Sequence, residues 1–302
     1  MTMDRHVTII VSDLETHPSM PRLMQSIARQ STGLERVEII VAGNGTHPES
    51  APSAWRAITG IDAVTLIALD NTVPPALARN EAVRAARGDL LLFLRPDYRL
   101  DPKYLTTALP LFTENPDVDV MYPDYIRLAP KRASAGRPGM IQLPDFDERL
   151  LQVQNIIGPA VMIRRTAWDE TVGFRDNTIY RDWDLWVQMA VAGRVFFHVN
   201  YPLASCEHAK VTFRERAEDG RCKAMLVINN QSFFHMQTIR WALSYLRGES
   251  WAQAFGFMTV PGPMDVTRMV QEHAMRKMGA DVLAREAIRQ FETAPQNVEA
   301  RR

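Results

Sequence analysis

The stretch ALARNEAVRAARGDLLLFLRPD, residues 76–97, joins a helical pattern directly to a strand pattern. Its first part begins just after two prolines and reaches Gly88, which are the start and stop signals of a helix. The run 90–94 is apolar at every position, as is typical of a strand covered on both faces. The strand ends abruptly in Arg95, Pro96 and Asp97. Charges placed where a buried strand surfaces indicate a site at this end of a sheet.

The same alternation of short apolar runs and helical patterns extends through the first half of the chain. Further buried strands are predicted at 7–11, 37–42 and 64–69, and a helix is predicted at 21–30. Strands at 117–123, 158–165 and 194–199 follow, with a helix at 181–193. This order predicts an α/β fold, with a mixed but mostly parallel sheet flanked by helices.

The chain changes character near residue 215, where strand patterns stop and helical patterns take over. We therefore predict one α/β domain over residues 1–215 and a helical C-terminal extension over residues 216–302. Residues 128–145 contain three prolines, two glycines and three cations, and we expect a mobile loop that acts as a lid.

Charge and composition exclude several classes of protein. The 302 residues contain 35 basic and 35 acidic side chains, whereas a general nucleic-acid binder would show a basic excess. Two cysteines are too few for a disulfide framework. The N-terminus lacks the features of a signal peptide, and no apolar window is long enough to span a membrane. We expect a cytoplasmic protein, with peripheral attachment at the inner face of the membrane left open.

Polar side chains follow each of the predicted parallel strands, at the edge where ligands bind in open α/β sheets. The residues at this edge are Ser12, Asp13 and Glu15 after the first strand, Gly43, Asn44, Gly45 and Thr46 after the second, Asp70 and Asn71 after the third, and Arg95 and Asp97 after the fourth. We expect these residues to face one cleft. Neither the G-x-G-x-x-G dinucleotide fingerprint nor a P-loop is present, so those nucleotide-binding classes are disfavoured.

Seven segments in order resemble the family 2 glycosyltransferases, which have the GT-A fold. They are VTIIV (7–11), LMQSIARQ (23–30), VEIIVAGNGT (37–46), ALARNEAVRAARGDLLLFL (76–94), NIIGPAVMIRRTAWDETVGF (155–174), YRDWDLWVQMAVAG (180–193) and YPLASCEH (201–208). The resemblance spans residues 7–213 and leaves the C-terminal helical extension uncovered. It implies the GT-A fold and the transfer of a sugar from a nucleotide-diphosphate donor.

The resemblance also implies roles for individual residues. Asp97 matches the last acid of the D-x-D motif, which binds Mg²⁺ or Mn²⁺, and His208 matches a histidine that reaches the diphosphate or the metal. Arg79 matches an arginine near the nucleotide, and with it the residues that follow the strands become candidates for donor binding. Asp182 matches the general base, which would take a proton from the acceptor hydroxyl in a single displacement that inverts the anomeric carbon.

For the acceptor, the resemblance implies a glycan or a lipid-linked molecule in polysaccharide biosynthesis. Asp124 matches an acid often present in the acceptor half of the family. Trp183 has two interpretations, as core packing or as a residue that lines an acceptor pocket. The aromatic-rich helices of the extension are interpreted as core or as the contact of a homodimer.

Four motifs depart from the family pattern. Arg95 stands at the first acid of D-x-D, Gly43 and Asn44 replace an acid pair, Arg181 replaces the glutamate before Asp182, and Asp13-Leu14 replaces a Thr-Tyr pair. Three interpretations of Arg95 follow: its guanidinium substitutes for part of the metal's role, it pairs with Asp97 and closes the donor site, or the fold persists as a catalytically degenerate module that binds a glycan or a partner.

Overall fold

The computed structural model describes residues 7–13, 18–32, 34–44, 51–70, 72–128, 139–207 and 213–293. The strands are β1 (Val7–Asp13), β2 (Val37–Asn44), β3 (Val64–Leu69), β4 (Leu90–Leu94), β5 (Tyr98–Leu100), β6 (Val118–Leu128), β7 (Gly139–Ile141), β8 (Val161–Arg164) and β9 (Val195–Glu207). The helices are α1 (Met20–Ala28), α2 (Ala51–Thr59), α3 (Pro75–Ala85), α4 (Tyr104–Glu114), α5 (Glu148–Val153), α6 (Arg165–Asp169), α7 (Arg181–Val191), α8 (Phe213–Asn229), α9 (Met236–Leu246) and α10 (Pro263–Thr293), with a 3₁₀ turn η1 (Gln231–Phe233).

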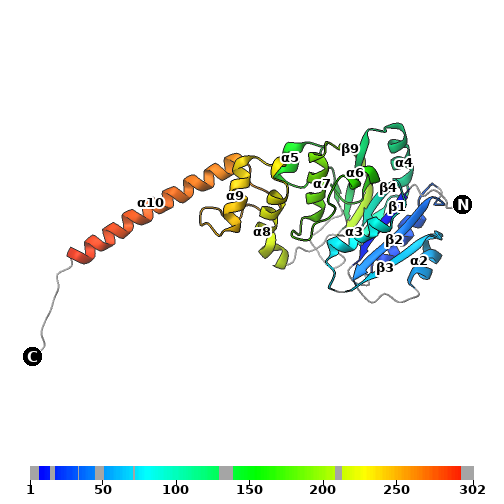
Figure 1. The fold of residues 1–302 in the computed structure, drawn as a ribbon, viewed down its shortest axis with the longest axis horizontal. Coiled ribbons are helices and arrows are strands. Elements are labelled where there is room, and N and C mark those ends of the chain that lie inside the picture. Colours follow the sequence, from blue (N-terminus) through cyan, green and yellow to red (C-terminus); the bar gives the residue numbers. More distant parts are fainter. Residues whose placement is uncertain are drawn as a thin grey trace, which may run out of the picture.

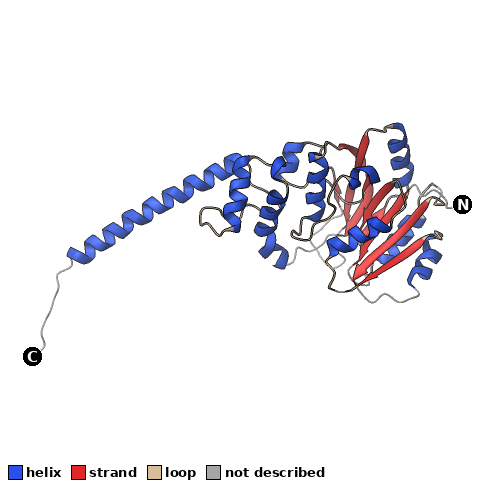
Figure 2. Ribbon diagram, viewed as in Figure 1, coloured by secondary structure: helices blue, strands red, loops and turns tan. Residues whose placement is uncertain are grey.

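One nine-stranded sheet with helices packed around it forms the part of the molecule near the N-terminus (Figure 2), with the strand order β3-β2-β1-β4-β8-β6-β9-β5 and β7 paired to β6. The strands β3, β2, β1 and β4 run parallel. β8 is antiparallel to both of its neighbours, β6 and β9 are parallel to each other, and β5 closes the far edge antiparallel to β9. This mixed, mostly parallel sheet flanked by helices confirms the predicted fold class.

The unbroken apolar runs arise because both faces of the sheet are covered. Neighbouring side chains of a strand point to opposite faces, so Ile9 and Leu92 enter the core beneath α1, α2 and α4, whereas Ile10 and Leu91 enter the core beneath α3 and α7. All four of these side chains are buried. Every position of such a strand must therefore be apolar, and the strand cannot show the alternation of a half-exposed sheet.

The C-terminal region is helical throughout its described part, residues 213–293. Leu226 of α8 and Trp241 of α9 belong to the same buried cluster as Val187 of α7, so α8 and α9 continue the core of the sheet domain. Helix α10 leads away from the body of the molecule (Figure 1). Its Met275 and Met278 side chains are 64% and 69% exposed. The predicted domain boundary and homodimer stay predictions.

Three sequence predictions differ from the structure in extent. β6 and β9 are longer than the predicted strands; their register shifts around Asp124, before the pair reaches the cleft at Arg127 and Glu207. Residues 139–141 of the predicted loop pair with β6 as β7, and residues 129–138 of that loop lie outside the described part of the chain. Within the described ranges, every helix is too short or too polar to cross a bilayer.

Gly88 links α3 to β4 where the backbone of β1 approaches most closely. A Cβ atom added at Gly88 would lie 2.5 Å from the Thr8 nitrogen and 2.8 Å from its Oγ1. That hydroxyl accepts the Gly88 N–H at 2.9 Å and donates to Glu38 Oε1 at 2.6 Å. Any side chain here must push β1 and β4 apart.

We expect Gly88→Ala to lower the free energy of unfolding by about 1–3 kcal/mol, the usual cost of overpacking a tight interior. Urea unfolding monitored by circular dichroism measures this loss. Gly139→Ala is the matched control, because an added Cβ there meets no atom within 4 Å. Equal stability of the Gly88 variant and the wild type would show that this approach is not tight.

Candidate active site

Two adjoining pockets lie at the carboxyl ends of β1 and β4. The inner pocket is narrow, about 30 Å³, and is lined by side chains of β1, α3, β4 and α7. The outer pocket is wider, about 350 Å³, and is lined by β5, β6, the end of β9 and residues 155 and 157–159. Both pockets are lined by Arg95, Tyr98, Gly158, Pro159 and Asp182. The two pockets therefore form one cleft with these five residues at its junction.

Arg79 of α3 connects three elements in the inner pocket. Its Nε donates to Ser12 Oγ at 2.9 Å and its Nη1 to Asp182 Oδ1 at 2.7 Å. The guanidinium also lies 5.0 Å from the centre of the Phe174 ring. The Arg79 side chain is 15% exposed, and these contacts hold it in place. Arg79 in turn fixes one oxygen of Asp182.

Asp182 lies in the first turn of α7 and lines both pockets. Its side chain is 48% exposed. Its Oδ2 makes no hydrogen bond to any described residue, whereas Oδ1 accepts from Arg79. A carboxylate with one fixed oxygen and one open oxygen, facing a cleft, is suited to act as a general base.

The turn Arg95-Pro96-Asp97 carries a two-pronged ion pair. Arg95 Nε donates to Asp97 Oδ1 at 3.0 Å and Nη2 donates to Oδ2 at 3.1 Å. The turn closes through the Tyr98 N–H, which donates to the Arg95 carbonyl at 3.0 Å. The Asp97 side chain is 11% exposed and that of Arg95 is 45% exposed. Asp97 therefore lies beneath the guanidinium and orients it toward the cleft.

The electrostatics of this turn keep Arg95 charged. Burial acts to lower the pKa of Arg95, but the neighbouring Tyr98 and Asp97 side chains raise it overall. Burial raises the pKa of Tyr98, opposed by the nearby Arg95, so the phenol stays neutral. Tyr98 also packs against the Arg95 guanidinium at 5.6 Å. The cleft thus presents a permanent cation beside a neutral ring.

The described residues do not fit a divalent metal. Asp97 is the predicted ligand, but both of its oxygens accept from Arg95. The described part of the chain has no group of three histidine, cysteine or acidic side chains that could hold an ion. His208, the other predicted ligand, lies outside the described residues. The cation that the structure places at this position is Arg95.

The structure thus brings together Ser12, Arg79, Arg95, Asp97 and Asp182. For two further predicted donor residues, Asp13 and Asn44, it describes only the backbone, at the ends of β1 and β2. Glu15 lies outside the described residues.

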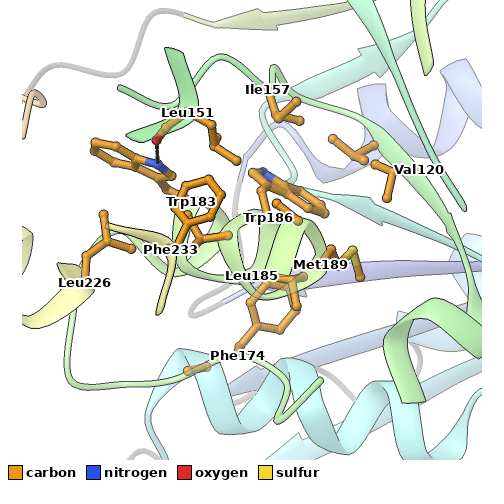
Figure 3. Close-up of a cluster of buried hydrophobic side chains, with 14 of the residues drawn as sticks. Val120, Leu151, Ile157, Phe174, Trp183, Leu185, Trp186, Met189, Leu226 and Phe233 are labelled. Atoms are coloured by element: carbon orange, nitrogen blue, oxygen red, sulfur yellow. Dashed lines mark hydrogen bonds between the residues drawn. The ribbon is translucent and has the colours of Figure 1, made fainter. Parts of the chain in front are cut away.

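Asp124 and Trp183 lie away from both pockets. Asp124 is fully buried on β6, where its Oδ1 contacts His198 Nε2 at 2.9 Å and accepts the Leu143 N–H at 2.8 Å. Trp183 is 1% exposed and its indole donates to the Leu151 carbonyl at 2.8 Å, within a core that Figure 3 shows. Trp186, on the next turn of α7, lines the inner pocket instead.

Arg181, the residue before Asp182, does not line either pocket. Its Nε is buried without a hydrogen-bond partner among the described residues. Burial is the main cause that lowers the pKa of Arg181, and repulsion from the Arg79 cation lowers it further. Arg181 adds positive potential behind Asp182.

Several cleft residues were not predicted from the sequence. Tyr98 directly follows the charged turn 95–97, and this position in the sequence could have identified it as a cleft residue. Phe174 closes a matched segment, and Arg127 and Glu207 belong to strand ends that were predicted too short. Met258 comes from the C-terminal region and has no signal in the sequence pattern.

The comparisons with known proteins agree with this geometry. The sequence profile of Glycosyl transferase family 2 matches residues 8–171, which is more than half of the chain. A "glucosyl-dolichyl phosphate glucuronosyltransferase" from Haloferax volcanii is 20% identical over 178 residues, which cover 57% of this chain. The matched part spans 56% of that relative's length.

Solved structures share the fold. S. aureus TarS, residues 1–349, aligns with a TM-score of 0.57 at 16% identity over 83% of this chain and 74% of its own. The same protein in complex with UDP-GlcNAc gives 0.56 over 80% and 71%. A mannosyltransferase from Pyrobaculum calidifontis in complex with GDP-Man and Mn²⁺ gives 0.52 at 17% identity over 96% and 81%. These neighbours establish the GT-A fold, and together with the profile match they show that the chain belongs to glycosyl transferase family 2.

Proposed function

We propose that this glycosyltransferase inverts the anomeric centre as it moves a sugar from a nucleotide-diphosphate donor to a hydroxyl of an acceptor. The observation that carries the proposal is the position of Asp182 at the junction of the two pockets, 2.7 Å from Arg79 and beside Arg95. A base, a cleft and fixed cations are what this displacement requires.

The nucleotide end of the donor is proposed to lie above the inner pocket, against Ser12 and Arg79, because the pocket itself, at about 30 Å³, is too small to enclose it. The inner pocket lies at the carboxyl ends of β1 and β4, where ligands of open α/β sheets bind. Neighbours of this fold bind UDP-GlcNAc, UDP and GDP-Man. The outer pocket, on the β6 and β9 side of Asp182, is then left for the transferred sugar and the acceptor.

The proposed chemistry is a single displacement. Asp182 accepts the proton of the acceptor hydroxyl while that oxygen forms a bond to the anomeric carbon. The bond from this carbon to the phosphate oxygen breaks on the opposite face, and the nucleoside diphosphate leaves with the electron pair. The configuration of the carbon is inverted as a result. Arg79 holds the carboxylate in place through the hydrogen bond to its Oδ1.

Arg95 is the proposed group that stabilises the charge of the leaving diphosphate. A guanidinium has five N–H donors. Two of them donate to Asp97, so three remain for phosphate oxygens. The contact with Asp97 therefore orients the fork and leaves it able to bind a ligand. No step of this mechanism passes through a metal, because the described donor set does not fit one.

A catalytically degenerate binding module is the second candidate. The observation in its favour is that the acids of the two pockets are already paired, Asp97 with Arg95, Asp182 with Arg79 and Glu207 with Arg99. In such a module the paired charges would hold the cleft shut. The two candidates differ in whether the protein binds and cleaves a nucleotide sugar.

The acceptor is proposed to be a glycan or a lipid-linked molecule in polysaccharide biosynthesis, at the cytoplasmic face of a membrane. The name of the Haloferax relative includes a dolichyl-phosphate-linked glucose, which supports a lipid-linked acceptor. The outer pocket has charged groups of both signs, Arg127 and Glu207, beside Tyr125 and Ile157. Such a lining suits the polar edge and the apolar face of a sugar ring.

The test of the proposed function is hydrolysis of a panel of nucleotide sugars, with water as the acceptor. We expect the protein to release a nucleoside diphosphate from at least one donor. Proton NMR should show the free sugar first in the anomeric configuration opposite to that of the donor. Retention of the donor's anomeric configuration would rule out the single displacement. If the protein neither binds nor cleaves any donor, the degenerate module is favoured.

A further inference from the structure

The loop between α9 and α10 reaches the cleft from the C-terminal region. Met258 lines the outer pocket together with Arg95, Asp97 and Asp182, although it lies 76 positions after Asp182 in the chain. Its side chain is 47% exposed. The helical region beyond the family match therefore contributes directly to the wall of the active site.

A buried ion pair in α8 anchors this loop. Lys223 is fully buried, and its Nζ lies 2.5 Å from Asp219 Oδ2 and donates to the Phe255 and Gly256 carbonyls. Asp219 Oδ1 in turn accepts the Met258 N–H at 3.1 Å. The pair thus hydrogen-bonds to the backbone of residues 255–258, with Lys223 as the donor and Asp219 as the acceptor. A buried charge pair satisfied in this way specifies one conformation of the loop.

The same carboxylate also contacts the segment that carries the proposed base. The Tyr180 hydroxyl donates to Asp219 Oδ1, and Tyr180 lies immediately before the first turn of α7. Asp219 Oδ1 therefore accepts two hydrogen bonds, one from Tyr180 at the start of α7 and one from the Met258 N–H. Asp219 sets where Met258 lies relative to Asp182.

The conformation of Met258 itself indicates that the loop is held. Its φ is 58°, in the left-handed region that non-glycine residues rarely adopt. Such a conformation persists where the surroundings over-determine it, and this occurs most often at functional sites. Beyond the loop, the Val260 N–H donates to the Val153 carbonyl at 2.8 Å, which ties the other end to α5.

We propose that residues 255–258 form the sugar-side wall of the active site, with Met258 against the sugar and Asp219 as its positioning residue. This inference rests on the proposed function, because it places the nucleotide above the inner pocket, against Ser12 and Arg79. The outer pocket lies on the other side of Asp182, so a sugar there meets Met258. A methionine is unbranched and polarizable, and it can pack against the carbon face of a sugar ring.

Cysteine labelling tests where Met258 lies. Met258→Cys would be made in a Cys206→Ser background, because Cys206 lines the same pocket, while Cys222 is buried. Maleimide labelling would be followed alone, with the nucleoside diphosphate, and with the intact nucleotide sugar that calorimetry shows the wild type to bind. We expect the nucleotide sugar to slow labelling at least about tenfold, and the nucleoside diphosphate to slow it far less.

The matched control is Met264→Cys in the same background. Met264 is 81% exposed in the first turn of α10 and lines neither pocket, so neither ligand should change its labelling rate. Equal slowing of residue 258 by both ligands would place Met258 at the nucleotide end and overturn the inference. No slowing by a ligand that calorimetry shows to be bound would overturn it as well.

The positioning role is tested by adding Asp219→Ala to the Met258→Cys protein, because alanine removes the oxygen that accepts the backbone N–H of residue 258. We expect the affinity for the nucleotide sugar to stay within about twofold while the protection of residue 258 is lost. Glu272→Gln, an exposed acid of α10, should leave the protection intact. Persistent protection in the Asp219 variant would show that Asp219 does not position the loop.

Asp219→Ala leaves Lys223 buried without its partner and can prevent folding. In that case Asp219→Ala with Lys223→Met removes both charges together with their hydrogen bonds to residues 255–258, and the same loss of protection is expected. If the wild type binds no nucleotide sugar at all, the proposed function fails first. If it binds one and residue 258 is not protected, the inference alone fails.

Discussion

Asp182→Asn should abolish transfer, with a fall of about 10²–10⁴-fold in kcat, because a general base contributes that much to proton abstraction. Asparagine keeps the shape of the side chain and can still accept from Arg79, whose Nη1 lies 2.7 Å from Oδ1. It cannot take a proton from the acceptor hydroxyl. Nucleotide affinity should therefore be preserved while turnover is lost, and calorimetry together with a nucleoside-diphosphate release assay measures both.

The control for this variant is Asp169→Asn, an exposed acid at the end of α6 that lines neither pocket. It should behave like the wild type in both assays. Full turnover by the Asp182→Asn protein would show that Asp182 is not the general base. Lost nucleotide affinity would instead assign Asp182 a role in arranging Arg79.

Arg95→Ala should weaken the binding of nucleoside diphosphate at least about tenfold, because charge-assisted hydrogen bonds to phosphate are lost. Turnover should fall further, by about 10²–10³-fold, since the same cation stabilises the charge that develops on the leaving group. Arg95→Lys should lie between, because lysine keeps the charge but lacks the guanidinium fork. Calorimetry and initial rates measure these effects.

The matched control is Arg99→Ala, four residues further on in the neighbouring strand β5. Arg99 pairs with Glu207 at 2.9 Å and lines neither the inner nor the outer pocket. It should keep its nucleotide affinity. Arg95→Asp is the complementary variant, because it places two carboxylates in one turn, and Mn²⁺ should then strengthen nucleotide binding. An Arg95→Ala protein with normal affinity would exclude the proposed role.

Much of the fold could be predicted because its central strands are buried on both faces. β1 and β4 read as continuous apolar runs for that reason, and the prolines and glycine around α3 mark its ends. Helix α4 was not predicted, and it contains Pro110 in its interior, where proline normally ends a helix. Tertiary packing of Tyr104, Leu105 and Phe112 outweighs that local preference.

The site was predictable where chemistry follows a strand end and unpredictable where the sequence lacks a local signal. Ser12 and Arg95 follow buried strands, and they meet because parallel strands end at one edge. Asp124 was expected near the acceptor, but His198 reaches it from β9 and leaves it buried away from the cleft. Met258 arrives through contacts of α8 that only the folded chain creates.

The most direct test of the account is a calorimetric titration of the wild-type protein with UDP, GDP and dTDP, first in EDTA and then with Mn²⁺. If Arg95 supplies the cation at the diphosphate, one nucleotide should bind in EDTA, and Mn²⁺ should change its Kd by less than about threefold. Binding that appears only with Mn²⁺ would contradict the role of Arg95. Binding of no nucleotide under either condition would contradict the transferase itself.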